Sequence, residues 1–191
     1  MRKSKSESAE TRKRIVSAAS AEFRRNGVDG TGLADLMSAA GLTHGGFYKH
    51  FESKDQVVEE ALAAASESMA EELKAALSRA PGSRGLNAAL AEYLSPEHRD
   101  APADGCPLAA MASELARSSN EVRERATAGF LDMVDALAAR MEGLSPAAAK
   151  KKAMFMVCAM IGAMTVARVV NDPELSASIL RQTYKNLTKA A

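Results

Sequence analysis

The chain has 191 residues, a formal net charge of +1 and only two cysteines, Cys106 and Cys158. This length can bury most of its apolar surface without disulfide bonds, and the opening Met-Arg-Lys-Ser-Lys is not an apolar signal segment, so we expect a cytoplasmic protein. Residues 1–54 hold ten Lys or Arg against six Asp or Glu, whereas the remainder holds 15 against 18. The basic N-terminal part is therefore the candidate for contact with nucleic-acid phosphate.

Helix-forming residues dominate the composition, aromatic residues make up 4%, and no β-branched run alternates with the two-residue period of a strand. The chain is therefore predicted to be all-α, with about nine helices. The first is expected from residue 7 or 8 to Asn26. Its buried face is indicated by Ile15, Ala19 and Phe23, which recur every four residues, and Asn26-Gly27 supplies a stop.

Two short helices are expected next, with a tight turn between them. Thr31 offers a side-chain cap for a helix that ends near Gly41, and Thr43 offers one for a helix that buries Phe47 and Phe51. A pair of short helices around a glycine-containing turn is the arrangement in which a second helix enters the major groove of DNA. Residues 31–51 are therefore predicted to form a helix-turn-helix.

The remaining helices form a larger second part. Ser53 caps a long fourth helix to about Ala80, which ends at Pro81-Gly82-Ser83. Further helices are expected at 83–94, from Cys106-Pro107 onward, and at 120–142, 145–171 and 173–189, with an exposed loop at 95–105. We expect a helix-turn-helix DNA-binding domain at 1–54 and a helical regulatory and dimerisation domain at 55–191.

The stretch from Gly41 to Lys54, Gly-Leu-Thr-His-Gly-Gly-Phe-Tyr-Lys-His-Phe-Glu-Ser-Lys, resembles the turn, recognition helix and fourth-helix entry of tetracycline-repressor (TetR) family regulators. Together with the preceding apolar pattern, the resemblance covers roughly the first 60 residues; beyond them it extends only to helix count, length and order. It implies a three-helix head and a body that dimerises through its last two long helices. It also implies a repressor of a palindromic operator in double-stranded DNA, released by a small hydrophobic or electrophilic effector.

Carried over position by position, the resemblance implies a set of DNA-binding residues: Thr31, Thr43, His44, Gly45, Gly46, Tyr48, Lys49, His50 and Lys54. Tyr48, His50 and Lys54 would contact phosphates, the two threonines would anchor helix ends to the DNA backbone, and the others would read base edges. The glycine pair departs from the commoner family pattern, in which Thr or Ser follows the first glycine. Close backbone approach to a base edge is therefore expected in place of one hydrogen bond.

The helix expected at 145–171 carries a ridge of small residues, with Ala159, Ala163 and Ala167 four apart beside Gly162. Such a ridge allows close helix approach and suits a symmetric homodimer, in which two recognition helices lie one turn of DNA apart. Packing of the ridge within one chain is the alternative, because periodicity does not separate the two kinds of burial.

Ten methionines and no tryptophan indicate an adaptable apolar interior. Candidate lining residues for an effector cavity are Met111, Phe130, Met133, Met154 and Phe155. Cys106 is a candidate sensor, because it lies at a helix start, where the helix dipole lowers a thiol pKa. It also resembles the sensing cysteine of some electrophile- and oxidant-responsive TetR-type regulators. Core packing is the alternative for each of these residues.

Other classes of function find little support. The sequence has no metal-ligand cluster, phosphate-binding glycine loop or nucleophile motif, and His44, His50 and His98 have no partner at catalytic spacing. We therefore expect no enzymatic activity, metal or cofactor. The apolar run 153–167 is shorter than the roughly 20 residues that cross a bilayer, so it is interpreted as a core or interface helix. The runner-up is a helical small-molecule-binding or adaptor protein without DNA binding.

Overall fold

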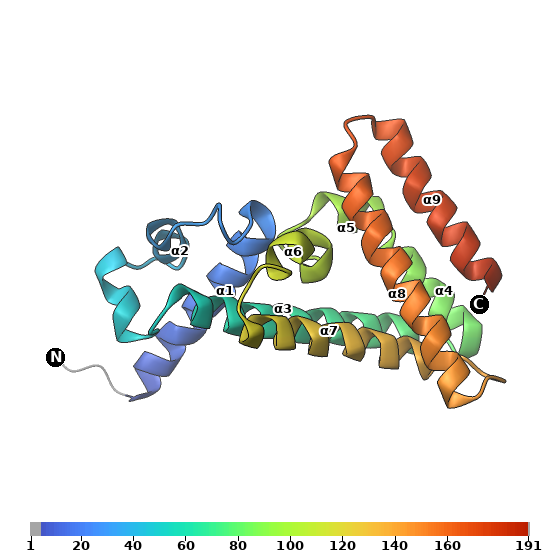
Figure 1. Ribbon diagram of the computed structural model, residues 1–191, viewed down its shortest axis with the longest axis horizontal. Helices are drawn as coiled ribbons and strands as arrows, with labels where there is room; N and C mark the ends of the chain where they lie inside the picture. The colour runs from blue at the N-terminus through green and yellow to red at the C-terminus, as the bar shows by residue number, and fades with distance from the viewer. Residues whose placement is uncertain (1–4, 191) are drawn as a thin grey trace.

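The computed structural model describes residues 5–190, and every regular element in that range is helical, as predicted. The elements are α1 (Lys5–Asn26), α2 (Leu33–Ala39), the 3-10 helix η1 (His44–Lys49), α3 (Lys54–Ser78), α4 (Gly82–Tyr93), α5 (Pro96–Asp100), α6 (Pro107–Leu115), α7 (Asn120–Ala138), α8 (Pro146–Val169) and α9 (Pro173–Ala190). Figure 1 shows a head of α1, α2 and η1 at one end of the long α3, and a body built on α3, α4, α7, α8 and α9.

The predicted helix starts are confirmed where a serine supplies the cap. The Ser53 hydroxyl accepts the Gln56 N–H at the start of α3, and the Ser145 hydroxyl accepts the Ala148 N–H at the start of α8. Each bond satisfies one of the free amides in a first helical turn. Local capping chemistry therefore fixes where both long helices begin.

Two predicted elements differ from the structure. The third helix is a six-residue 3-10 helix, because a segment this short with Gly45 and Gly46 lacks the propensity for a longer α-helix. The segment 95–105 is not an exposed loop: it contains α5, whose start is capped by Ser95, and Ala103 and Gly105 are buried against the body.

Two hydrophobic cores meet on α3. The head core joins α1, α2 and η1 to the first turns of α3 through Leu62, and includes Met111 and Leu115 of α6. The body core begins at Met69 and joins α3 to α4, α7, α8 and α9. The predicted boundary at residue 54 lies where α3 begins, whereas the cores separate between Leu62 and Met69. A displacement of α3 would therefore be felt by both parts.

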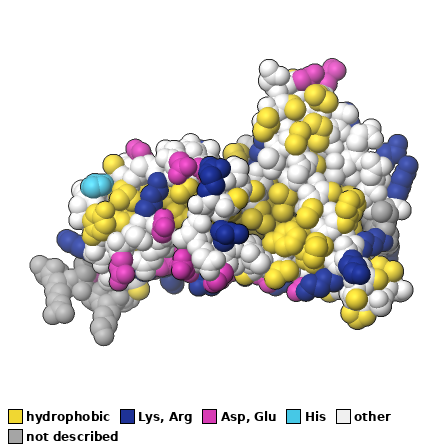
Figure 2. Space-filling model, viewed as in Figure 1, with side chains coloured by type: hydrophobic (Ala, Val, Ile, Leu, Met, Phe, Trp, Pro, Cys, Tyr) yellow, Lys and Arg dark blue, Asp and Glu magenta, His cyan; other side chains and the backbone are white. Residues whose placement is uncertain are grey.

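The small-residue ridge of α8 packs within the chain. Ala163 and Ala167 are 9% and 2% exposed and pack in the body core, and Ala159 is half-buried against it, whereas Gly162 is exposed. The packing alternative therefore holds for Ala163 and Ala167, and these two residues are not available to a second copy. The opposite side of α8 exposes Met154, Phe155, Cys158, Val166 and Val169. Figure 2 shows hydrophobic side chains gathered over this part of the body. We call these five residues the α8 face.

Within the described residues, α8 is the one helix that is long and apolar enough to cross a bilayer. Of its most apolar 18-residue window, 39% is buried inside the chain. Length and composition alone do not distinguish a membrane span from a helix that packs against protein.

Candidate DNA-binding site and effector cavity

The turn between α2 and η1 is a Schellman motif. The Leu42 N–H donates to the Met37 carbonyl at 2.8 Å and the Gly41 N–H donates to the Ser38 carbonyl at 2.8 Å, which satisfies the free carbonyls at the end of α2. Gly41 has φ of +69°, a left-handed conformation that is costly for residues with a Cβ. This glycine therefore ends α2 and directs the chain into η1, and the predicted turn is confirmed.

The predicted recognition segment presents most of its polar residues to solvent. Thr43, His44, Gly45, Tyr48 and Lys49 are exposed, and the Tyr48 side chain is 69% exposed. Gly46 and His50 are half-buried. On the inner side of η1, Phe47 is fully buried and stacks on Phe51 with ring centroids 5.6 Å apart. One surface of η1 is thus anchored in the core while the other is free to meet a ligand.

The threonines do not behave as predicted. Thr31 is 2% exposed and its hydroxyl donates to the Gly27 carbonyl at 2.7 Å, so it cannot cap α2, whose N-cap is Gly32 without a side-chain acceptor. The burial of Thr31 also removes it from the candidate phosphate contacts. Thr43 does occupy the N-cap position of η1, but its hydroxyl accepts no capping hydrogen bond.

Lys54 has an intramolecular partner that the sequence did not reveal. Its ammonium group donates to the Val28 carbonyl at 2.6 Å and so ties the start of α3 to the α1–α2 loop. An ammonium group carries three donors, so two are left for another acceptor. Lys54 is thus both a structural contact and a candidate phosphate contact.

Two arginines of α1 position the helix-turn-helix, and sequence reasoning missed both roles. Arg12 pairs with Glu60 of α3, donates to the His50 carbonyl and lies 4.2 Å from the centroid of the Phe51 ring. Arg14 Nη2 donates to the Ala40 carbonyl at 2.7 Å. The two guanidinium groups therefore hold the ends of η1 and α2. No local pattern signals these bonds, since their partners lie 26 to 48 residues away.

The head is tied to the body by two sets of polar contacts. Arg24 Nη1 of α1 donates to the Gly105 carbonyl at 2.8 Å. The Glu114 carboxylate of α6 accepts the N–H groups of Val28 and Asp29, each at 3.1 Å. Both contacts connect α6 and the segment before it to the helix-turn-helix. A shift of this part of the body would therefore change the orientation of the head.

The predicted effector residues do not line one cavity. Met111 belongs to the head core, Met133 to the body core, and Phe130 packs half-buried against the body core. Met154 and Phe155 are 42% and 65% exposed on the α8 face. The proposed grouping is therefore wrong, because α7 and α8 direct these side chains to different surroundings.

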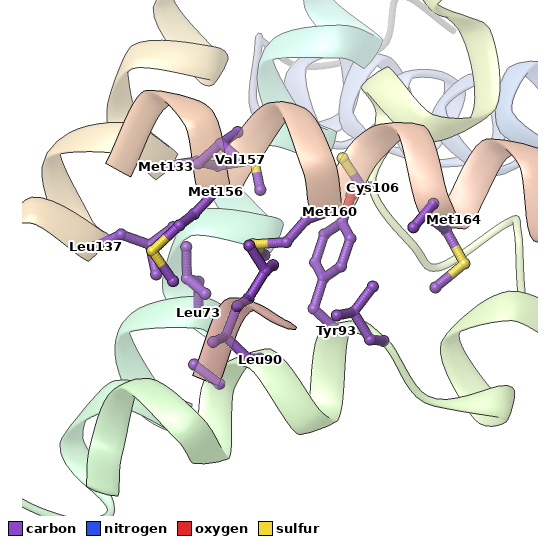
Figure 3. Close-up of a cluster of buried hydrophobic side chains, with 14 of the residues drawn as sticks. Leu73, Leu90, Tyr93, Cys106, Met133, Leu137, Met156, Val157, Met160 and Met164 are labelled. Carbon is purple, nitrogen blue, oxygen red and sulfur yellow. The ribbon is translucent and has the colours of Figure 1, made fainter. Parts of the chain in front are cut away.

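Cys106 is buried, contrary to the prediction of an accessible thiol at an exposed helix start. Its exposed fraction is 0%, and burial raises its pKa against the weaker lowering effects of Tyr93, two backbone N–H groups and Arg168. Figure 3 shows the Tyr93 hydroxyl directed toward Cys106 among the methionines of α8. Cys106 therefore packs in the body core, as the alternative interpretation of this residue predicts.

His98 of α5 holds the segment before Cys106 in place. Its Nδ1 lies 2.6 Å from the Tyr93 carbonyl, and its Nε2 accepts the Cys106 N–H at 3.0 Å. A carbonyl only accepts and a backbone N–H only donates, so the ring must be neutral with its proton on Nδ1. Burial lowers the pKa of His98; the hydrogen bond to the Tyr93 carbonyl opposes this effect and Arg168 adds to it, and the net lowering favours the same neutral form.

A cavity of about 220 Å³ opens between α3, α4 and the segment 95–105. Its apolar lining consists mainly of buried residues: Met69, Leu73, Ala76, Ala89 and Tyr93. Its charged lining is entirely acidic: Glu72, Glu92, Glu97 and Asp104. Within residues 5–190, no group of three or more His, Cys, Asp and Glu side chains is arranged to hold a metal ion. The cavity was not predicted, because α5, which borders it, was expected to be loop.

Comparison with known protein families matches both parts of the chain. The family described as bacterial regulatory proteins, tetR family, matches residues 15–61, which contain the helix-turn-helix. The C-terminal domain of LmrA/YxaF-like transcriptional regulators matches residues 85–175. Together the two matches cover the head and most of the body.

Curated relatives resemble the N-terminal part of the chain. The HTH-type transcriptional regulator TtgR of Pseudomonas putida is 42% identical over 59 residues, which are 31% of this chain and 28% of that protein. The probable acrEF/envCD operon repressor of Escherichia coli K12 is 39% identical over 59 residues, 31% of this chain and 27% of that protein. The similarity thus spans under a third of these relatives' own length.

Solved structures resemble the whole chain. A TetR transcriptional regulator from Chloroflexus aurantiacus is 26% identical, with a TM-score of 0.75 over 96% of this chain and 94% of its own. A TetR-family regulator from Cytophaga hutchinsonii is 24% identical, with a TM-score of 0.78 over 98% of each chain, which shows the shared fold. From the helix-turn-helix to the last helices, the chain belongs to the tetR family of bacterial regulatory proteins.

Proposed function

We propose that the protein is a sequence-specific transcriptional repressor that binds a palindromic DNA operator as a homodimer. The observation that carries this proposal is the helix-turn-helix of the head, in which η1 is anchored by Phe47 while Tyr48 and Lys49 project into solvent. Residues 1–54 bind DNA in this proposal, and residues 55–191 dimerise and respond to an effector. A cytoplasmic location follows from this role.

The chemistry of each side chain in the head determines whether we assign it to phosphate contacts or to base contacts. Tyr48, His50 and Lys54 contact phosphate oxygens, which fixes the position of the head on the duplex without reading sequence. His44, Gly45, Gly46 and Lys49 face base edges in the major groove, and Thr43 contacts the backbone from the start of η1. Thr31 is left out, because its hydroxyl is buried and bonded to Gly27.

Dimerisation is assigned to the α8 face, together with Leu175 at the start of α9, which is 50% exposed. Exposed apolar side chains along one helix are unfavourable in water, and a second copy that packs on the same face buries them. A two-fold axis through this surface places one head on each half of a palindrome.

Release from DNA is assigned to an effector that binds the body and changes the orientation of the head. The contacts Arg24 to Gly105 and Glu114 to Val28 and Asp29 are the routes by which the body acts on the head. Any effector must bind the released state more tightly than the DNA-bound state. Release through modification of Cys106 stays a prediction, and it would require the segment 95–105 to open first, because the thiol has no exposed surface.

Selection from a random pool of DNA duplexes, performed with the full-length protein and with Tyr48→Ala, tests this proposal. We expect a palindromic sequence to be enriched by the wild type and to be bound at least about tenfold less tightly by the variant, since hydrogen bonds to charged groups contribute about 1.5–3 kcal/mol. Tyr184→Ala in α9, far from η1 in the chain, serves as the matched control. Absence of enrichment at low salt would instead favour a helical small-molecule-binding or adaptor protein.

A further inference from the structure

The cavity of about 220 Å³ has charged groups of one sign only. No Lys or Arg is among its lining residues, and of its four carboxylates only Glu92 has an ion-pair partner, Arg79, among the described residues. His98 also lines the cavity, but its neutral form adds no positive charge. Carboxylates around a single opening sum their negative potential there, and this potential attracts a cation.

The floor of the same cavity is apolar and already dehydrated. Leu73, Ala76 and Ala89 are 4%, 2% and 1% exposed, and they would contact a hydrocarbon group without further loss of water from the protein side. Tyr93, which is 4% exposed, adds an aromatic side chain to the lining. Its hydroxyl has no oxygen or nitrogen partner among the described residues. A metal ion would leave this floor uncovered, whereas an amphiphilic ligand would use both the floor and the acidic rim.

We propose that this cavity binds an organic cation with an apolar body, in which the cationic group lies against Glu72 and Asp104 and the apolar group lies on the floor formed by α3 and α4. This ligand class is assigned as the effector, a role that rests on the function proposed above. The binding itself does not require DNA.

The position of Arg24 connects the cavity to the head. This arginine donates to the carbonyl of Gly105, which lines the cavity, and no carboxylate of the described residues lies within ion-pair distance of its guanidinium group. Burial lowers the pKa of Arg24, and the more distant charges of Asp104 and Glu72 act against this effect. A cation bound at these two carboxylates would compete with Arg24 for the same negative charge. Binding of a cation in the cavity would therefore weaken the attraction between Arg24 and these carboxylates, and with it the contact between the body and α1.

Calorimetry with the full-length protein and three small probes tests the ligand class. The probes are benzyltrimethylammonium, its neutral carbon isostere neopentylbenzene, and the anion phenylacetate. We expect the cation to bind at least about tenfold more tightly than the isostere, because two nearby carboxylates each contribute up to about 1 kcal/mol at a solvent-accessible site. Phenylacetate is expected not to bind.

Neutralising variants locate the site. The double variant Glu72→Gln, Asp104→Asn is expected to lower the affinity for benzyltrimethylammonium about tenfold, whereas Glu71→Gln, an exposed neighbour outside the cavity, leaves it unchanged. Arg24→Gln removes the competing charge and is expected to raise this affinity about threefold. Its matched control is Arg25→Gln, because Arg25 pairs with Glu22 and does not line the cavity.

Equal affinity for the cation and the neutral isostere, or an affinity unaffected by the double variant, would overturn the inference. Because calorimetry is performed without DNA, failure of the proposed function is seen separately. A protein that binds benzyltrimethylammonium but enriches no operator contradicts the repressor and with it the effector role, while the cation site stands. A protein that binds its operator but not the cation contradicts this inference alone.

Discussion

Two glycines in η1 differ from those in the tight turns of the protein. Gly27, Gly41, Gly82 and Gly143 adopt positive φ, whereas Gly45 and Gly46 do not. A Cβ on Gly45 would meet no atom within 4 Å, and one on Gly46 would make an ordinary contact with Met37 at 3.5 Å. Neither glycine is therefore required by the fold. In the proposed complex, close approach of the backbone to DNA would account for both, since a missing side chain allows contact with a base edge.

Gly45→Ala is expected to separate DNA binding from stability. The variant should unfold within about 1 kcal/mol of the wild type, because alanine favours a helical backbone and space is open around it. Its operator affinity should fall about tenfold if the added methyl group displaces the base contact. Urea unfolding and operator titration measure the two quantities.

The control for this prediction is Gly41→Ala. Since Gly41 has φ of +69°, this variant should lose about 1–2 kcal/mol of unfolding free energy. Unchanged operator affinity in Gly45→Ala would show that the backbone of η1 does not approach the bases at this position.

At the scale of single residues, sequence alone predicts which side of a short helix is buried, but it does not predict which of several nearby backbone groups a side chain bonds. The four-residue spacing of Phe47 and Phe51 predicts the buried side of this segment and therefore an exposed surface for Tyr48 and Lys49, which the structure confirms. Thr31 was assigned wrongly because its hydroxyl has two possible partners close by, the amides that follow and the Gly27 carbonyl that precedes it. The structure has the second bond, and residue type alone does not favour either.

At the scale of elements, α5 in the segment 95–106 shows why a short helix is not predicted from local sequence. Its prolines and charges are typical of a loop, yet α5 is held by long-range bonds: Arg168 of α8 donates to the carbonyls of His98 and Arg99 at 2.7 and 3.0 Å. His98 bonds to Tyr93 and to Cys106 on either side. The long helices were predictable from periodicity and caps, whereas this one depends on partners up to 77 residues away, the farthest being Ser176, whose hydroxyl accepts from Arg99.

Acid is expected to destabilise this segment through His98. Burial keeps the pKa of His98 below its usual value, so as pH falls below about 6.5 the unfolded chain takes up a proton that the folded chain does not. The stabilising contribution is therefore present above that pH and is lost as pH falls toward the folded pKa. Urea unfolding at pH 7.5 and 5.5 should show this loss in the wild type and a smaller one in His98→Gln. An identical pH dependence in both proteins would show that the ring is not held in its neutral form.

Glu114 is expected to hold the α1–α2 loop against α6. Glu114→Ala removes the acceptor for the Val28 and Asp29 amides, so their hydrogen exchange should become faster by about tenfold or more, since bonds to charged groups contribute about 1.5–3 kcal/mol. Exchange measured by NMR or mass spectrometry reports this change directly. Glu71→Ala, on the exposed side of α3, should leave both amides unaffected. Equal protection in Glu114→Ala would mean that the carboxylate does not restrain the head.

At the scale of the whole molecule, the α8 face is the surface proposed to pair two copies and so to set the arrangement of their heads. The family resemblance correctly anticipated a head and a helical body, but the sequence did not identify which side of α8 is exposed. Small residues and large apolar residues alternate around this helix, and only the packing of α6, α7 and α9 shows that Ala163 and Ala167 face inward. The large apolar residues Phe155 and Val166 are left outside.

Phe155→Lys is expected to weaken the dimer. A charge in the centre of an apolar interface should raise the dimer dissociation constant by at least about tenfold, in the range found for central interface residues. Light scattering after size-exclusion chromatography measures the mass. Leu144→Lys is the matched control, because Leu144 is an exposed apolar residue outside the α8 face. Comparable dissociation in both variants, or in neither, would place the dimer interface elsewhere.

The salt dependence of operator affinity tests the central claim, that two copies of the head bind one palindrome, most directly. The logarithm of the association constant should fall steeply with the logarithm of salt concentration, because each phosphate contact releases condensed counterions. For Lys54→Ala, which removes the proposed cationic phosphate contact from each head, the slope should become shallower by about 2, about one unit for each copy of the head. A weak salt dependence that is the same in both proteins would contradict DNA binding through the head.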